Sequence, residues 1–181
     1  MPTKCWPTEW WQSLGLTVLC ALAPPALAQS ASQQGVSVEI TPLPSEQVTA
    51  FYLNRGFSES EIEAYRSACV FSVILRNTHE TAPLTLDQSD WQWQQADGQS
   101  VKPKPTDQWL AEMREAGIAK GPRVAFRWAQ FPAEQTYHPK DWNQGMLALP
   151  VASGTELSVT LRWQRSGQPQ TLTRHSLTCA P

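Results

Sequence analysis

Four cysteines are the residues of this sequence whose chemistry depends most on where the chain is located. Cys5 and Cys20 lie in the first 28 residues, which have the layout of an export signal, whereas Cys69 and Cys179 lie far downstream. Removal of the signal leaves two cysteines in an oxidising compartment, where such a pair is typical of one disulfide. Neither belongs to the C-x-x-C motif of catalytic dithiols. We therefore predict a structural bridge between Cys69 and Cys179.

The export signal is predicted over residues 1–28. Residues 13–23 form an apolar run, Lys4 precedes them, and Ala26 and Ala28 supply the small residues of a cleavage site. This layout places the mature protein in the periplasm or outside the cell. The alternative is an uncleaved segment that anchors the chain at a membrane interface through three early tryptophans, Trp6, Trp10 and Trp11.

Aromatic residues offer a second kind of chemistry, which is the recognition of a partner by burial of ring surface. Segment 51–57 is rich in aromatic residues, and Trp142 stands in a polar stretch. Large rings with cations at their rim are typical of protein interfaces. We expect a protein partner in the periplasm to be bound by six residues, which are Tyr52, Arg55, Phe57, Tyr137, Lys140 and Trp142.

Copper handling is an alternative binding chemistry. His138, Met146 and His79 carry the imidazole and thioether groups that copper sites use. The sequence has no H-x-H motif and no M-x-x-M cluster, so these residues form a weak pattern.

Carbohydrate binding is the other alternative. Trp91 and Trp93 are two residues apart and so share one face of a strand, where they could stack on a sugar ring. Trp142 could add a third ring. Burial in a β-sandwich core competes with this interpretation, because large aromatics dominate such cores.

Catalytic motifs are absent from the sequence. It has no G-x-S-x-G, no HExxH and no glycine-rich phosphate loop. Glu59, Glu61 and Glu63 alternate at a helix start, which spreads them around the axis instead of aligning them across a cleft. We expect a non-enzymatic protein without a cofactor.

Composition narrows the class of partner. The formal net charge is -2, which does not suit a nucleic-acid-binding protein, and no later apolar run reaches the roughly 18 residues of a membrane span. Residues 29–35 are small and polar, and we expect them to be a flexible amino terminus. Residues 36–181 are the right size for a single domain.

Strand patterns dominate that domain. Apolar residues alternate with polar ones over 36–41 and, most regularly, over 157–163, whereas 69–75 is apolar on both faces and is expected to be central. The alternation of Val124, Phe126 and Trp128 predicts a further strand, with Trp128, like Trp163, in the core.

Turn and bulge signals separate the strands. Leu86 and Trp91 are five residues apart and out of phase, which predicts a bulge between them. Asp97 and Gly98 predict a hairpin turn. Seven or eight strands without a βαβ rhythm indicate an antiparallel immunoglobulin-like β-sandwich.

Two helical insertions interrupt the strands. The first contains helices near 46–53 and 59–68, the latter opened by a Ser58/Glu61 capping box, and the second is a helix over 108–116. The insertions either cover sheet edges or form a partner surface.

The order of these features resembles bacterial exported telokin-like, immunoglobulin-like domains of poorly characterised function. The resemblance rests on Arg76-Asn77 after the central strand, Trp93 before Asp97-Gly98, residues 137–141, residues 145–150 and the strand 157–163. It implies a β-sandwich fold over residues 36–179 and no particular activity.

Overall fold

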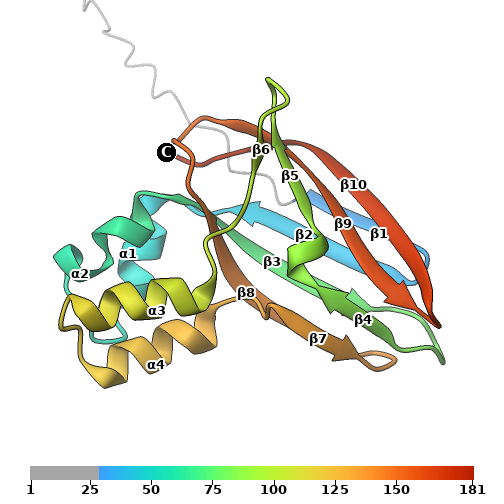
Figure 1. Ribbon diagram of the computed structural model, residues 1–181, viewed down its shortest axis with the longest axis horizontal. Helices are drawn as coiled ribbons and strands as arrows, with labels where there is room; N and C mark the ends of the chain where they lie inside the picture. Colours follow the sequence, from blue (N-terminus) through green and yellow to red (C-terminus); the bar gives the residue numbers. More distant parts are fainter. Residues whose placement is uncertain (1–28) are drawn as a thin grey trace, which may run out of the picture.

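The predicted antiparallel β-sandwich is confirmed. The computed structural model describes residues 29–181, with side chains from residue 32 onward, and the predicted signal in residues 1–28 lies outside the described residues. The described part holds ten strands in two antiparallel sheets, with four α-helices gathered at one end (Figure 1). In chain order the elements are β1 (Gln29–Gln33), β2 (Val36–Pro42), α1 (Ser45–Leu53), α2 (Glu59–Arg66), β3 (Cys69–Asn77), β4 (Leu84–Asp87), the 3₁₀ helix η1 (Gln88–Asp90), β5 (Gln92–Gln95), β6 (Ser100–Val101), α3 (Thr106–Glu115), α4 (Lys120–Ala129), β7 (Glu134–Tyr137), β8 (Trp142–Leu149), β9 (Glu156–Arg165) and β10 (Gln168–Thr178).

The first sheet has the strand order β1-β2-β3-β8. Its central strand β3 is buried on both faces near its start, as its sequence predicts. Phe71 faces the core between the two sheets, whereas Val70 faces the helices together with Ala148 of β8. The register places Val70 opposite Ala148, so these two neighbouring side chains belong to the contact between the sheet and the helices.

The second sheet is built around β9. Strand β10 pairs along one edge of β9, and β5 and β4 share its other edge, with β6 beyond β5 and β7 beyond β4. The 3₁₀ helix η1 lies between β4 and β5, where the sequence predicts a bulge. It corrects the phase, so that Leu86 and Trp91 are both buried in the sandwich core. Gly98, with φ of 84°, turns the chain between β5 and β6 as expected.

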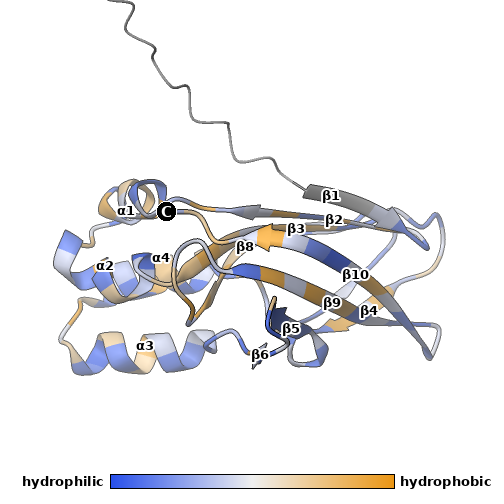
Figure 2. Cartoon of the chain, turned by 90° about the horizontal axis from the view of Figure 1, so that it is seen from above, coloured by the Kyte–Doolittle hydropathy of each residue, from blue (hydrophilic) through white to orange (hydrophobic). Residues whose placement is uncertain are grey.

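Two separate cores hold the molecule together. The sandwich core lies between the sheets, and a helical core is formed by α1–α4 against one end of β3 and β8. Figure 2 shows the helices at one end of the two stacked sheets. Aromatic rings fill the helical core, in which Phe126 stacks on Tyr52 and meets the edge of Tyr65. No helix within residues 29–181 is both long and apolar enough to cross a membrane.

The predicted disulfide is formed between Cys69 and Cys179, 110 residues apart. Cys69 begins β3 of the first sheet, and Cys179 follows β10 of the second sheet, so the bridge joins the two sheets. Backbone hydrogen bonds between Cys179 and the turn at Gly154 and Thr155 fix the carboxyl end beside it.

Segment 120–129 corrects the sequence prediction, because it is helix α4 and not a strand. Apolar and polar residues alternate over five positions, and this pattern fits a strand. The same residues also fit a helix in which Phe126 alone is buried, and this is what the structure shows. Pro122 lies in the first helical turn, where its missing N–H costs no hydrogen bond. Trp128, expected in the core, is 82 % exposed, while Trp163 is buried as predicted. The second helical insertion therefore contains two helices.

The amino-terminal residues also differ from expectation. Residues 29–35 were expected to be a flexible tail, and the structure instead assigns Gln29–Gln33 to β1, antiparallel to β2. Gln34 and Gly35, both with positive φ, make the tight turn that joins the two strands. With the short strands β6 and β7, this raises the strand number above the seven or eight expected.

Candidate functional site

Helix α4 carries the most exposed large apolar residue of the described chain. Val124 is 45 % exposed and Trp128 is 82 % exposed, although Phe126 between them is fully buried. At about 100° per residue, positions 124 and 128 lie on one face of a helix, and position 126 lies on the opposite side. A side chain as large as tryptophan that is left in solvent is a typical anchor for a binding partner.

Three cations lie beside this apolar pair. Lys120, Arg123 and Arg127 belong to α4, which has no acidic residue. The helical wheel places them on one side of Val124 and Trp128. We call these five residues the α4 ridge. Tryptophan beside arginine is the combination enriched at the centre of protein interfaces.

Arg127 is held by only one exposed ion pair. Its Nη2 lies 3.0 Å from Oδ1 of Asp107 on α3, and both side chains are more than half exposed. Exposed pairs of this kind contribute little to stability. Arg127 can therefore exchange Asp107 for a partner's carboxylate at small cost.

Close backbone contact positions α4 on the sheet. The N–H of Phe131, two residues after the helix, donates to the carbonyl of Met146 in β8 at 2.8 Å. Gly145 makes this approach possible, because a Cβ there would lie 2.3 Å from the backbone nitrogen of Phe131. The glycine thus sets where α4 ends and how it lies against β8.

A buried hydrogen-bond chain fixes the other side of α4. The Gln130 amide donates from Nε2 to the hydroxyl of Tyr52 at 2.8 Å, and its Oε1 accepts from the hydroxyl of Tyr65 at 3.0 Å. The Tyr52 hydroxyl in turn points at the sulfur of Met146, 3.8 Å away. These contacts orient the helix so that Phe126 faces inward and Trp128 outward.

A hollow of about 490 Å³ lies beside the ridge. Arg127 of α4 and Gln130 just after it line the hollow, and Trp91 and Phe131 line it from the sandwich, with ring centroids 5.6 Å apart. Its size lies within the range of ligand-binding clefts. It gives the surface at Arg127 a concave part.

Trp142 is the second exposed tryptophan of the described chain, at 54 %. It begins β8, and the Arg76 guanidinium lies over its ring, 4.8 Å from the centroid. The loop before it is fixed by the buried Asn77, whose backbone bonds to Lys140 and Asp141. Met146, beside the end of α4, is four residues or about 13 Å further along the strand. Trp142 and the α4 ridge are therefore separate surfaces.

The residues predicted to bind a partner do not form one surface. Tyr52 and Phe57 are buried in the helical core, and Tyr137 is buried in the sandwich core. They are not accessible to a partner in this structure. Arg55 and Lys140 are exposed, but Arg55 covers the Phe51 ring and Lys140 pairs with Glu80.

Two of the three residues considered for copper are engaged in other contacts. His79 accepts two backbone N–H bonds at Nδ1, from Thr81 and Ala82, and Met146 contacts the helical core. His138 is exposed and directly follows β7. Within residues 29–181, no group of three or more His, Cys, Asp and Glu side chains could hold a metal ion.

The tryptophan pair considered for sugar stacking is not available on the surface. Trp91 and Trp93 both lie in the sandwich core, and Trp93 stacks on Phe71 with centroids 5.6 Å apart. The core interpretation is the one that the structure supports for these two rings.

A groove between α2 and α3 is the second surface feature of the helical layer. Its first part, of about 350 Å³, is floored by Tyr65, Trp109, Met113 and Ile118. A second hollow of about 470 Å³ shares Ala64 and Trp109 with the first and continues to Val151. The floor residues are largely covered, so the groove exposes little of each ring.

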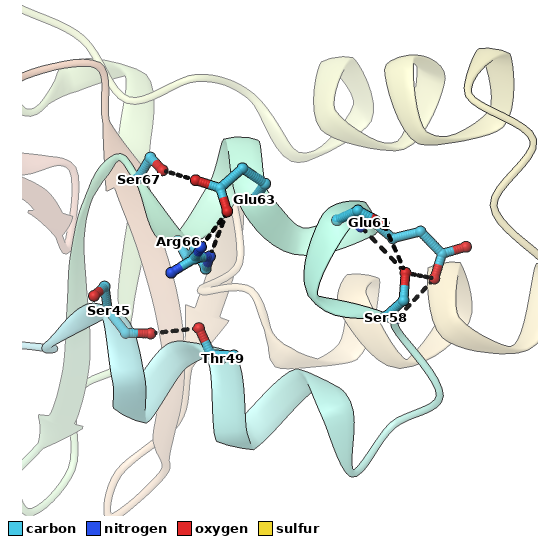
Figure 3. A network of polar contacts seen from close by, with 8 residues as sticks. Ser45, Thr49, Ser58, Glu61, Glu63, Arg66 and Ser67 are labelled. Atoms are coloured by element: carbon cyan, nitrogen blue, oxygen red, sulfur yellow. Dashed lines mark hydrogen bonds and ion pairs between the residues drawn. The ribbon is translucent and has the colours of Figure 1, made fainter.

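Two carboxylates and one cation line this groove: Glu61 of α2, Glu112 of α3, and Lys104, which pairs with Glu112 and lies over the Trp109 ring. Figure 3 shows the polar contacts of α2: the predicted capping box of Ser58 and Glu61, and the bonds of Glu63 to Arg66 and Ser67. Hydrogen bonds from the Ser58 N–H and hydroxyl lower the pKa of Glu61. Bonds from Ser67 and Arg66 lower the pKa of Glu63. Both carboxyls are therefore ionised at neutral pH.

Sequence reasoning missed the α4 ridge. A usable signal was present, since Val124 and Trp128 have the spacing of one helical face and Gly117 ends the preceding helix. The shorter period-2 pattern through Phe126 hid it.

Comparisons with known proteins found two solved structures with limited similarity to the chain. No family model matches the sequence, and no curated protein matches it. The chain is similar to a proposed lipoprotein (ycdA) of Bacillus subtilis, with 16% identity and a TM-score of 0.45, over 83% of this chain and 39% of that one. It is also similar to a DUF4426 family protein of Pseudomonas aeruginosa, with 9% identity and a TM-score of 0.38, over 84% and 99% of the two chains. The chain thus spans about two fifths of the first of these, and neither likeness bears on function.

Proposed function

We propose that this chain is an exported, non-enzymatic binding domain that docks on a protein partner through the α4 ridge. The observation that carries the proposal is the 82 % exposure of Trp128 on a helix whose only charges are cations. Burying that ring in an interface would remove its apolar surface from water. Lys120, Arg123 and Arg127 would then pair with carboxylates of the partner at the rim. The partner surface is therefore apolar at its centre and acidic around it.

Export to the periplasm or beyond is part of the proposal. The disulfide between Cys69 and Cys179 supports it, because such bridges persist in oxidising compartments and are rare in the cytosol. A periplasmic location would put the ridge within reach of exported or membrane-anchored clients.

Site-specific photo-crosslinking in cells tests the proposal. A photoreactive residue at position 124 lies beside Trp128 and leaves the indole in place. We expect it to capture a protein partner, and we expect Trp128→Ala in the same chain to reduce the crosslinked product at least about tenfold, as for an interface hot spot. The same residue at position 99, on the exposed β5–β6 hairpin, is the matched control.

The purified complex then gives a second measurement. The cationic rim predicts that the Kd of the captured partner rises with salt concentration. Trp142→Ala should leave this Kd unchanged, because Trp142 lies on another surface. Equal crosslinking from positions 124 and 99, or wild-type affinity of the Trp128→Ala variant, contradicts the proposal.

A further inference from the structure

We infer that the α4 ridge of one copy docks in the α2–α3 groove of a second copy of this chain. The inference rests on the proposed function in that it uses the same ridge, but it names a different occupant and a second surface. Nothing in the role proposed above requires the groove.

The α4 ridge and the α2–α3 groove carry charges of opposite sign. Helix α2 has three carboxylates, Glu59, Glu61 and Glu63, against Arg66. Of these, Glu61 lines the groove together with Glu112 of α3, and the cation of the groove lining is Lys104, which pairs with Glu112. Helix α4 has three cations and no carboxylate. The charged residues that line the groove are thus two carboxylates against one cation, so its net charge is opposite in sign to that of the ridge.

Shape is the second observation. The groove is a trough between two helices with an apolar floor, which is the kind of site that accepts one face of a third helix. Val124 and Trp128 are spaced by one helical turn, so both can point into the same trough. Ala64, which is small and exposed, lines both hollows and leaves the entrance open.

The arrangement of the helices excludes docking within one chain. Phe126 of α4 packs against Tyr65 of α2 and Trp109 of α3, with ring centroids 4.9 Å and 6.5 Å apart. Val124 and Trp128 lie on the opposite, exposed face of α4. The ridge therefore points away from the groove of its own chain. A contact between copies is therefore head-to-tail. A chain of such copies keeps one free ridge at one end and one free groove at the other end.

A mixing experiment with two single-surface variants of the mature, disulfide-intact protein tests the inference. Ala64→Arg blocks the groove with a bulky cation at an exposed helical position. Trp128→Glu removes the ridge anchor and adds a negative charge, which the groove carboxylates repel. Sedimentation equilibrium up to about 1 mM should show reversible association of the wild type that weakens with salt. Each variant alone should associate at least about tenfold more weakly.

The mixture of the two variants gives the decisive result. Ala64→Arg keeps its ridge and Trp128→Glu keeps its groove, so the pair should form a one-to-one dimer that cannot grow further. A wild type that stays monomeric over this range overturns the inference. So does a wild type that associates while the mixed variants do not pair, since the contact then joins other surfaces. Gln99→Arg on the β5–β6 hairpin is the control and should behave as the wild type.

The two proposals can fail independently. Monomeric wild type together with capture of another protein from position 124 removes self-docking and leaves the proposed function intact. Self-association with crosslinks only between copies of this chain removes the proposed function and leaves self-docking intact.

Discussion

Three tyrosines, Tyr52, Tyr65 and Tyr137, are all that the chain contains, and all three are buried. Burial raises the pKa of Tyr52, although the hydrogen bond from Gln130 works in the opposite direction. Burial raises the pKa of Tyr65 as well, and the neighbouring Tyr52 adds to the effect. Burial alone raises the pKa of Tyr137. Every phenol therefore keeps its proton at pH values where an exposed tyrosine loses it.

Alkaline titration checks this at the residue scale. The unfolded chain ionises its tyrosines near pH 10, whereas the folded chain does not. Below about pH 10 these groups leave the free energy of unfolding unchanged. Above it, the unfolded state releases protons that the folded state retains, so stability falls as pH rises. We expect the 295 nm absorbance to rise in one cooperative step together with the loss of circular dichroism. A gradual rise near pH 10 in folded protein would contradict the burial of the three rings.

Tryptophans show what sequence can and cannot predict at this scale. The burial of Trp163 follows from a strand that alternates over seven residues, because each strand face is defined by period 2. Trp128 has only two alternating neighbours, and its exposure depends on Phe126 packing against Tyr52, which is 74 residues away. No local pattern contains that contact. The cysteine pair was predictable because only two thiols remain once the signal is excluded.

Strand and helix types followed from the sequence wherever an element had its own local signal. The capping box of α2 and the doubly apolar β3 are examples. Strands β1, β6 and β7 were missed because short strands at sheet edges need not carry an apolar pattern; Glu134–Tyr137, for instance, buries only Tyr137. Their pairing comes from the neighbouring strand, as in β7 against β4. Edge elements and surfaces are thus decided by tertiary contacts.

Gly145 of β8 lies where the end of α4 comes closest to the sheet. We expect Gly145→Ala to push the end of α4 away from β8. The added Cβ would lie 2.3 Å from the Phe131 nitrogen and 2.5 Å from the Gln130 carbonyl carbon, which are backbone atoms and cannot rotate away. We expect a loss of about 1–3 kcal/mol or more in the free energy of unfolding, measured in urea. The displaced end of α4 should also weaken crosslinking from position 124.

Gly121→Ala in α4 is the matched control for this substitution. Apart from its chain neighbours and the backbone of its own helix, nothing lies within 4 Å of a Cβ at that position, and its φ is not in the left-handed region. Alanine should stabilise the helix by about 0.5–1 kcal/mol. If Gly145→Ala were as harmless as Gly121→Ala, the close approach of α4 to β8 would not be a constraint on the ridge.

The whole molecule depends on two cores that share one pair of strands. Phe71 and Leu147 face the sandwich core, and Val70 and Ala148 face the helical core. Each core therefore orders the strands on which the other packs. The α4 ridge and the α2–α3 groove belong to the helical core, so their geometry depends on the integrity of the sandwich.

The bridge between Cys69 and Cys179 is where this dependence can be measured. It ties the start of β3 to the chain end after β10, beside α1, whose Ser45 N–H donates to the Pro181 carbonyl. A closed loop of about 110 residues restricts the unfolded chain by roughly 4–5 kcal/mol in the chain-entropy description. We expect the Cys69→Ala, Cys179→Ala double variant to lose about that much stability in urea, with both cores melting in one transition. Reduction of the wild type should give the same midpoint shift. A loss below about 1 kcal/mol, or separate melting of the tryptophan fluorescence and the helical circular dichroism, would show that the bridge does not couple the sheets and that the helical layer stands alone.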